Sequence, residues 1–144
     1  MWRILIADDQ ENIRALVRTL LENEGSWEVC GEASDGSQTV ELCKRLSPDL
    51  VVLDVQMTNL NGVSMNGFEA IRLIARNWPQ IRILALSIDE SVHFARAAEE
   101  CGAHGFLSKV QSTAHLAEAV TALLRNGTYF VLPPSKELKY GRGG

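Results

Sequence analysis

Residues 48–54 read PDLVVLD, and this stretch decides the fold class. Its centre, residues 50–53, is a continuous apolar run, which is typical of a central parallel strand covered on both faces. Asp54 follows the run with a carboxylate, and Pro48 before it marks the end of a preceding helix. The stretch therefore predicts a buried strand with an acidic group at its carboxyl end.

On either side of this strand, short apolar runs alternate with segments of helical periodicity. The pattern predicts strands at 3–7, 27–33, 50–53, 81–86 and 105–107. It predicts helices at 11–23, 36–46, 67–77 and 90–100, and a fifth helix that includes 116–125. Such alternation predicts one parallel sheet with right-handed crossovers and helices on both faces.

The composition narrows the class of protein. A chain of 144 residues fits one domain, and 46% hydrophobic with 22% charged residues is normal for a soluble globular protein. A net charge of -4 argues against unassisted binding to nucleic acid. The apolar runs are far shorter than the roughly 20 residues of a membrane span, and the apolar strand pattern at residue 3 leaves no room for a signal peptide. We expect a cytoplasmic protein with no membrane contact.

Cysteine and histidine residues add no metal motif. Cys30, Cys43 and Cys101 match neither a zinc spacing nor a disulfide framework, and we expect reduced, mostly buried thiols. The histidines at positions 93, 104 and 115 are scattered, and we expect solvated surface side chains.

Polar side chains follow four of the predicted strands, where ligands bind in parallel α/β sheets. They are Asp8, Asp9, Asp54, Ser87 and Lys109. Clustered carboxylates raise each other's pKa and repel, so the cluster favours a hard cation such as Mg²⁺. Asp54 could attack phosphorus as a nucleophile, with Lys109 and the metal neutralising the phosphoryl charge and Ser87 donating a hydrogen bond.

Each of these residues alone has an ordinary explanation. Asp8 could be a helix N-cap, Ser87 a structural hydroxyl and Lys109 a solvated charge. Their occurrence in order at the strand ends is what favours a functional site.

The sequence resembles the receiver domains of bacterial response regulators from residue 3 to about 132. The resemblance is carried by IADD (6–9) with Arg14, GEASDG (31–36), PDLVVLD (48–54), Ser87 and GFLSK (105–109). It implies a flavodoxin-like (βα)5 three-layer sandwich with a five-stranded parallel sheet. The receiver domain would span residues 1–132, and residues 133–144 would be a polar tail or linker stub.

The resemblance also implies roles. Asp54 would accept a phosphoryl group from a sensor histidine kinase, a phosphotransfer protein or a small phosphodonor, and Lys109 would pair with it. Mg²⁺ would be bound by Asp8, Asp9, Asp54 and the Gln56 backbone carbonyl. Ser87 and Phe106 would form the switch, with Phe106 rotating inward; a plain core aromatic is the alternative for Phe106. The domain would catalyse only its own phosphotransfer and slow autodephosphorylation.

Some motifs, including GEA (31–33) and the stretch 127–133, resemble the subfamily in which a helix-turn-helix DNA-binding domain follows the receiver. DNA contact, and with it control of transcription, would then need an output domain absent from these 144 residues. A stand-alone receiver and part of a longer regulator both stay open, as does a homodimer.

The stretch after Asp54 departs from the family pattern. Thr58 replaces a proline after Met57, and MNG (65–67) nearly repeats an earlier Asn-Gly pair. We interpret residues 63–67 as an insertion of about five residues that alters access to the phosphorylation site. Gln56 and Asp89 would flank the phosphoryl group and set its dephosphorylation rate, and Ile88 would narrow its approach.

Three rival functions follow from the same residues. A phosphatase or phosphotransferase that forms an aspartyl phosphate needs a second Asp two residues after the nucleophile, and Gln56 cannot transfer protons. A dinucleotide-binding protein needs a glycine-rich loop after the first strand, which is missing. A degenerate receiver that acts as a phosphorylation-independent interaction module is the remaining alternative.

Overall fold

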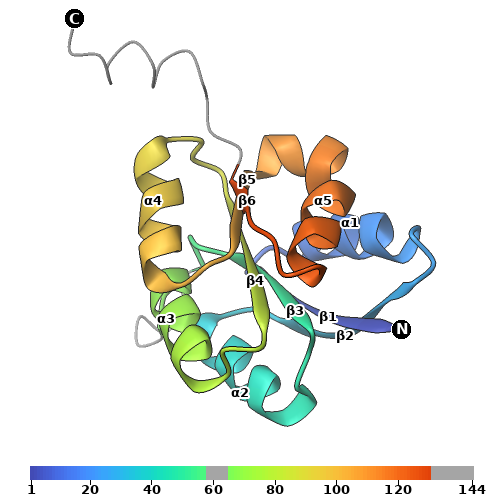
Figure 1. The fold of residues 1–144 in the computed structure, drawn as a ribbon, viewed down its shortest axis with the longest axis horizontal. Helices are drawn as coiled ribbons and strands as arrows, with labels where there is room; N and C mark the ends of the chain where they lie inside the picture. The colour runs from blue at the N-terminus through green and yellow to red at the C-terminus, as the bar shows by residue number, and fades with distance from the viewer. Residues whose placement is uncertain (58–64, 131–144) are drawn as a thin grey trace, which may run out of the picture.

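The computed structural model, which describes residues 1–57 and 65–130, alternates strands and helices along the chain (Figure 1). The strands are β1 (Trp2–Ala7), β2 (Trp27–Ala33), β3 (Leu50–Asp54), β4 (Arg82–Ser87), β5 (Gly105–Ser108) and β6 (Tyr129–Phe130). The helices are α1 (Glu11–Glu22), α2 (Gly36–Leu46), α3 (Gly67–Asn77), α4 (Val92–Cys101) and α5 (Lys109–Leu124). The predicted order of strands and helices is confirmed.

The strands form one parallel sheet in the order β2-β1-β3-β4-β5-β6. Five strands were expected, and the described part of the sheet has six. The sixth, β6, is only two residues long and pairs Tyr129 with Gly105 and Phe130 with Phe106. β3 lies between β1 and β4, so the strand that ends at Asp54 is internal to the sheet.

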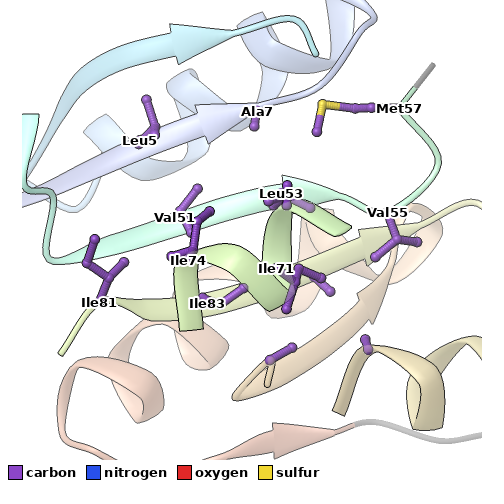
Figure 2. Close-up of a cluster of buried hydrophobic side chains, with 14 of the residues drawn as sticks. Leu5, Ala7, Val51, Leu53, Val55, Met57, Ile71, Ile74, Ile81 and Ile83 are labelled. Carbon is purple, nitrogen blue, oxygen red and sulfur yellow. The ribbon is translucent and has the colours of Figure 1, made fainter. Parts of the chain in front are cut away.

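Both faces of the sheet are covered, which makes three layers (Figure 1). Val51 and Leu53 of β3 belong to one buried cluster, which includes side chains of α2, α3 and α4 (Figure 2). Leu50 and Val52 belong to the other, which includes side chains of α1 and α5. Because successive side chains of a strand point to opposite faces, the continuous apolar run supplies both clusters.

Capping residues set the helix ends near the site. Asp35 accepts a hydrogen bond from the Gln38 amide at the start of α2, and Ser91 accepts one from the Phe94 amide at the start of α4. Asn66 and Glu69 form a capping box at the start of α3. Each cap satisfies an amide that the first helical turn leaves unpaired.

Helix α5 contains the predicted helical segment and extends it towards the N-terminus. It begins at Lys109, directly after β5, because Ser108 and Gln111 form a second capping box there. The helix start therefore fixes the position of Lys109 at the end of the sheet.

One histidine prediction was wrong. His104 is half-buried, and its Nδ1 accepts a hydrogen bond of 3.0 Å from the Ile83 amide at the start of β4. The three cysteines are free thiols, of which Cys43 is buried and the other two are partly buried. Within the described residues, no helix combines the length and apolar character needed to cross a membrane.

The structure also tests part of the interpretation of residues 63–67 as an insertion. Residues 63 and 64, like Thr58 and the tail at 133–144, lie outside the described residues. Asn66 and Gly67, however, are the N-cap and first residue of α3. A Cβ on Gly67 would lie 2.4 Å from the Val55 Cα and 2.5 Å from the Asp54 carbonyl oxygen. Gly67 is thus required for close packing against the end of β3, and an insertion at residues 63–67 stays a prediction.

Candidate functional site

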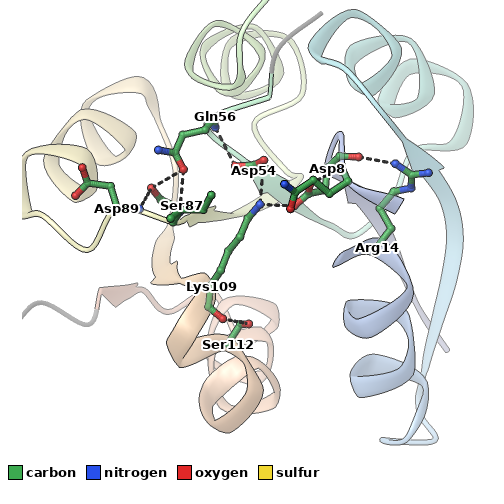
Figure 3. A network of polar contacts seen from close by, with 10 residues as sticks. Asp8, Arg14, Asp54, Gln56, Ser87, Asp89, Lys109 and Ser112 are labelled. Carbon is green, nitrogen blue, oxygen red and sulfur yellow. Dashed lines mark hydrogen bonds and ion pairs between the residues drawn. The ribbon is translucent and has the colours of Figure 1, made fainter. Parts of the chain in front are cut away.

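Three charged side chains meet at the carboxyl ends of β1, β3 and β5 (Figure 3). The Nζ of Lys109 lies 2.9 Å from the Oδ2 of Asp8 and 3.2 Å from the Oδ2 of Asp54. Both aspartates are only 2% exposed. Strand pairing brings these residues together: β1 pairs with β3, and β4 pairs with both β3 and β5. Asp54 thus meets Asp8, 46 positions before it, and Lys109, 55 positions after it.

Asp9 completes the acidic group that the sequence predicted. One carboxylate oxygen from each of Asp8, Asp9 and Asp54 lies within 4.8 Å of the others. Asp9 is exposed whereas its two neighbours are buried, so the cluster opens to solvent on the Asp9 side.

Backbone amides fix the two buried carboxylates. The amide of Gln10 donates to Asp8 Oδ1, and the amide of Gln56 donates to Asp54 Oδ1, each at 2.9 Å. Helix α1 has Gln10 rather than Asp8 as its N-cap residue, so the helix-cap explanation of Asp8 is wrong. The Oδ2 atoms are left to face the centre of the cluster, towards Lys109.

Sequence reasoning quoted Arg14 only as part of a motif, but the structure gives it a contact. Its guanidinium donates a hydrogen bond of 2.7 Å to the carbonyl oxygen of Asp8 and pairs with Glu32. Arg14 therefore holds the backbone that carries Asp8. Its position on the first turn of α1 was the only signal in the sequence.

Burial and charge contacts act in opposite directions on the pKa values of Asp54 and Lys109. Burial raises the pKa of Asp54, and the charge of Asp8 adds to this, although the Gln56 amide and Lys109 act against it. Burial lowers the pKa of Lys109, but its contacts with Asp8 and Asp54 outweigh burial and raise it above the ordinary value. Lys109 is thus charged and lies beside a group of three carboxylates, those of Asp8, Asp9 and Asp54.

The acidic cluster fits a bound divalent cation. Asp8 Oδ2 is buried and, apart from the ion pair with Lys109, lacks a hydrogen-bond partner among the described residues. The three carboxylates offer oxygen atoms within 4.8 Å of one another, and hard oxygen ligands are what Mg²⁺ prefers. The donor set therefore matches the predicted ion.

Ser87 lies beside this cluster at the end of β4, fully buried. Its hydroxyl contacts Gln56 Oε1 at 3.2 Å and accepts a hydrogen bond of 3.0 Å from the Asp89 amide (Figure 3). The side chain of Gln56 thus joins the loops after β3 and β4, a contact that sequence reasoning did not predict.

Phe106 is 1% exposed and belongs to the buried cluster that includes Ala95 and Ala98 of α4. Phe106 is therefore a core aromatic in this structure. A movement of Phe106 on phosphorylation stays a prediction.

The fold and the strand-end residues define a class: a flavodoxin-like parallel α/β domain with an acidic cluster and a lysine at the carboxyl edge of its sheet. The model of the response regulator receiver domain family matches residues 4–121. The chain belongs to this family, whose members act in two-component signalling and are typically phosphorylated on an aspartate.

Its relatives include transcriptional regulators. The chain is 32% identical over 127 residues to the transcriptional regulatory protein DegU of Brevibacillus brevis, covering 88% of this chain and 52% of that protein. It is 36% identical over 124 residues to the transcriptional regulatory protein LiaR of Bacillus subtilis, covering 85% and 56%. The chain thus spans about half the length of these curated relatives.

A solved structure agrees with the fold over almost the whole chain. It is a two-component response regulator of the LuxR family from Aurantimonas sp. SI85-9A1, 29% identical, with a TM-score of 0.86. The match covers 99% of this chain and 98% of that one.

Proposed function

We propose that Asp54 is the phosphoacceptor of this receiver domain and that Lys109 is its electrostatic partner. The observation that carries the proposal is the position of the Lys109 ammonium, 3.2 Å from Asp54 Oδ2 and 2.9 Å from Asp8 Oδ2. A cation held between two buried carboxylates is placed to pair with a phosphoryl group that forms on one of them.

The chemistry is the transfer of one phosphoryl group. A carboxylate oxygen of Asp54 attacks the phosphorus of a phosphohistidine or a small acyl phosphate. The new oxygen–phosphorus bond forms as the bond to the donor's nitrogen or oxygen breaks, and the leaving group departs with the electron pair. Lys109 offsets the charge on the phosphoryl oxygens, and the Gln56 amide, 2.9 Å from Asp54 Oδ1, keeps the nucleophile oriented.

Asp8, Asp9 and Asp54, with the Gln56 backbone carbonyl, are the residues proposed to hold Mg²⁺. When bound, the ion would neutralise negative charge on the phosphoryl oxygens. The buried Asp8 Oδ2, whose one contact given among the described residues is the ion pair with Lys109, supports this assignment.

The proposed partners follow from the family. A sensor histidine kinase or a phosphotransfer protein would supply the phosphoryl group, in the cytoplasm. DNA would be reached through an output domain, because relatives that are transcriptional regulators are about twice as long as the matched region. Residues 1–132 would form the receiver and residues 133–144 the tail or linker stub, and the domain would catalyse only its own phosphotransfer and slow autodephosphorylation.

The test is intact-mass spectrometry after incubation with acetyl phosphate and Mg²⁺. Wild-type protein should gain one phosphoryl mass, and Asp54→Asn should gain none. Chelation of Mg²⁺ before donor addition should suppress the adduct. An adduct of equal yield on Asp54→Asn would refute the assignment, and no adduct with any donor or kinase would favour the degenerate interaction module.

A further inference from the structure

The hydrogen-bond directions around Ser87 are fixed by backbone amides. The Ile88 amide donates to Gln56 Oε1 at 2.8 Å, which identifies that atom as the carbonyl oxygen of the side-chain amide. The Asp89 amide donates to Ser87 Oγ at 3.0 Å, so the hydroxyl oxygen is an acceptor there. The remaining contact, 3.2 Å from Ser87 Oγ to Gln56 Oε1, must then use the hydroxyl proton.

A serine hydroxyl has one proton to donate. In this structure that proton is given to Gln56, on the loop that follows Asp54. A phosphoryl group on Asp54 presents acceptor oxygens only, so Ser87 can bind it only by donating the same proton. The two interactions exclude each other.

We propose that Gln56 is a positioning residue that restrains Ser87 in the unphosphorylated domain by competing with the phosphoryl group for the Ser87 proton. The inference rests on the proposed function of Asp54. Gln56 thereby raises the free energy that Ser87 needs to move its hydrogen bond to the phosphoryl group.

Neighbouring contacts strengthen this assignment. Of the two contacts described for the Ser87 hydroxyl, only the one with Gln56 uses its proton, because the Asp89 amide donates to Ser87 Oγ. The loop that carries Ser87 continues through Asp89, whose Oδ1 accepts from the Ser91 amide at 2.7 Å, to the N-cap of α4. Ser87 is thus one link of a hydrogen-bonded chain that runs from Gln56 to the start of α4.

The experiment measures the affinity for beryllofluoride, a phosphoryl mimic, at saturating Mg²⁺ by isothermal titration calorimetry. Four proteins form a double-mutant cycle: wild type, Gln56→Met, Ser87→Ala and the double variant. Methionine keeps the length of glutamine but has no carbonyl acceptor, and Gln80→Met, in an exposed turn, is the matched control. Amide proton exchange of Ile88, followed by NMR without beryllofluoride, reports whether the Gln56 contact exists in solution.

We expect Gln56→Met to bind beryllofluoride roughly two- to tenfold more tightly than wild type, which is the effect of one net hydrogen bond. In the Ser87→Ala background the same substitution should have no effect, and Ile88 should exchange faster in Gln56→Met. Gln80→Met should match wild type.

Equal or weaker binding by Gln56→Met, or an equal gain with and without Ser87, would overturn the inference and leave the phosphoacceptor assignment intact. Unchanged Ile88 exchange in Gln56→Met would also overturn it. Failure of all four proteins to bind beryllofluoride would overturn the proposed function and the inference together.

Discussion

The stability of the domain should fall in mild acid because of one buried contact at His104. The imidazole Nδ1 accepts the Ile83 amide hydrogen bond, and only the neutral imidazole can do so. Burial, together with the positive charge of Arg82, lowers the pKa of His104 to about 4. The contact joins the start of β4 to the residue before β5. β4 ends at Ser87, and β5 ends at Ser108, next to Lys109.

The size of this stability loss follows from the linkage between proton binding at His104 and unfolding. The unfolded chain takes up the His104 proton near pH 6.5 whereas the folded chain resists it down to about pH 4, so stability is lost as the pH falls through this window. Between pH 7.5 and 4.5 the upper limit is about 2.5 kcal/mol. Because His104 is only half-buried, solvent screening reduces the expected loss to about 1 kcal/mol.

The assay is urea unfolding at pH 7.5 and pH 4.5 for wild type, His104→Asn and His93→Asn. Asparagine offers an acceptor near the position of Nδ1 and does not titrate, whereas His93 is exposed on α4. Other groups that titrate in this range contribute to all three proteins. The loss of unfolding free energy between the two pH values should be about 1 kcal/mol smaller in His104→Asn than in the other two. An equal loss in all three proteins would refute the reasoning.

Three further perturbations test the packing and charge of the domain. Gly67→Ala should destabilise it by about 1–3 kcal/mol in urea unfolding, because the added Cβ meets the Val55 backbone at 2.4 Å; an unchanged midpoint would contradict this packing. Burial raises the pKa of Cys43 to about 12, so iodoacetamide at pH 8 should leave Cys43 unmodified in folded protein and label it in urea, as peptide mass mapping would show; labelling at equal rates would contradict its burial. Lys109→Met should cost about 3–5 kcal/mol at pH 7.5 in chelator, because two buried carboxylates lose their counter-ion. Added Mg²⁺ should restore part of the loss, and stability equal to wild type in chelator would contradict the ion pairs described.

Much of the fold was accessible from the sequence because its signals are local. The apolar run at 50–53 and the alternation of helical and strand periods fixed the class of sheet, and the strand ends identified Asp8, Asp9, Asp54 and Lys109. These residues come together because parallel strands end at one edge.

Features that the sequence did not predict mostly depend on contacts between segments far apart in the chain. β6 is two residues long, too short to show a period, and forms because β5 offers an edge. The start of α5 at Lys109, by contrast, is set by a local signal, the capping box of Ser108 and Gln111, which the pattern of apolar residues alone does not show. The partner of His104 lies on another strand, and no spacing within the sequence reports it.

The Gln56 contact illustrates the same limit within the site. Its position two residues after Asp54 predicted that it would flank the phosphoryl group. That its carbonyl oxygen would accept the proton of Ser87 depends on the pairing of β3 with β4, which places the two loops together.

The central claim is that Asp54, and no other carboxylate, carries the phosphoryl group. Protein incubated with acetyl phosphate and Mg²⁺ is reduced with borohydride, which converts an aspartyl phosphate to homoserine, and the peptides are mapped by mass spectrometry beside a sample that received no donor. Homoserine at position 54 alone, only in the donor-treated sample, is the expected result. Homoserine at another aspartate, with position 54 unmodified, would contradict the account.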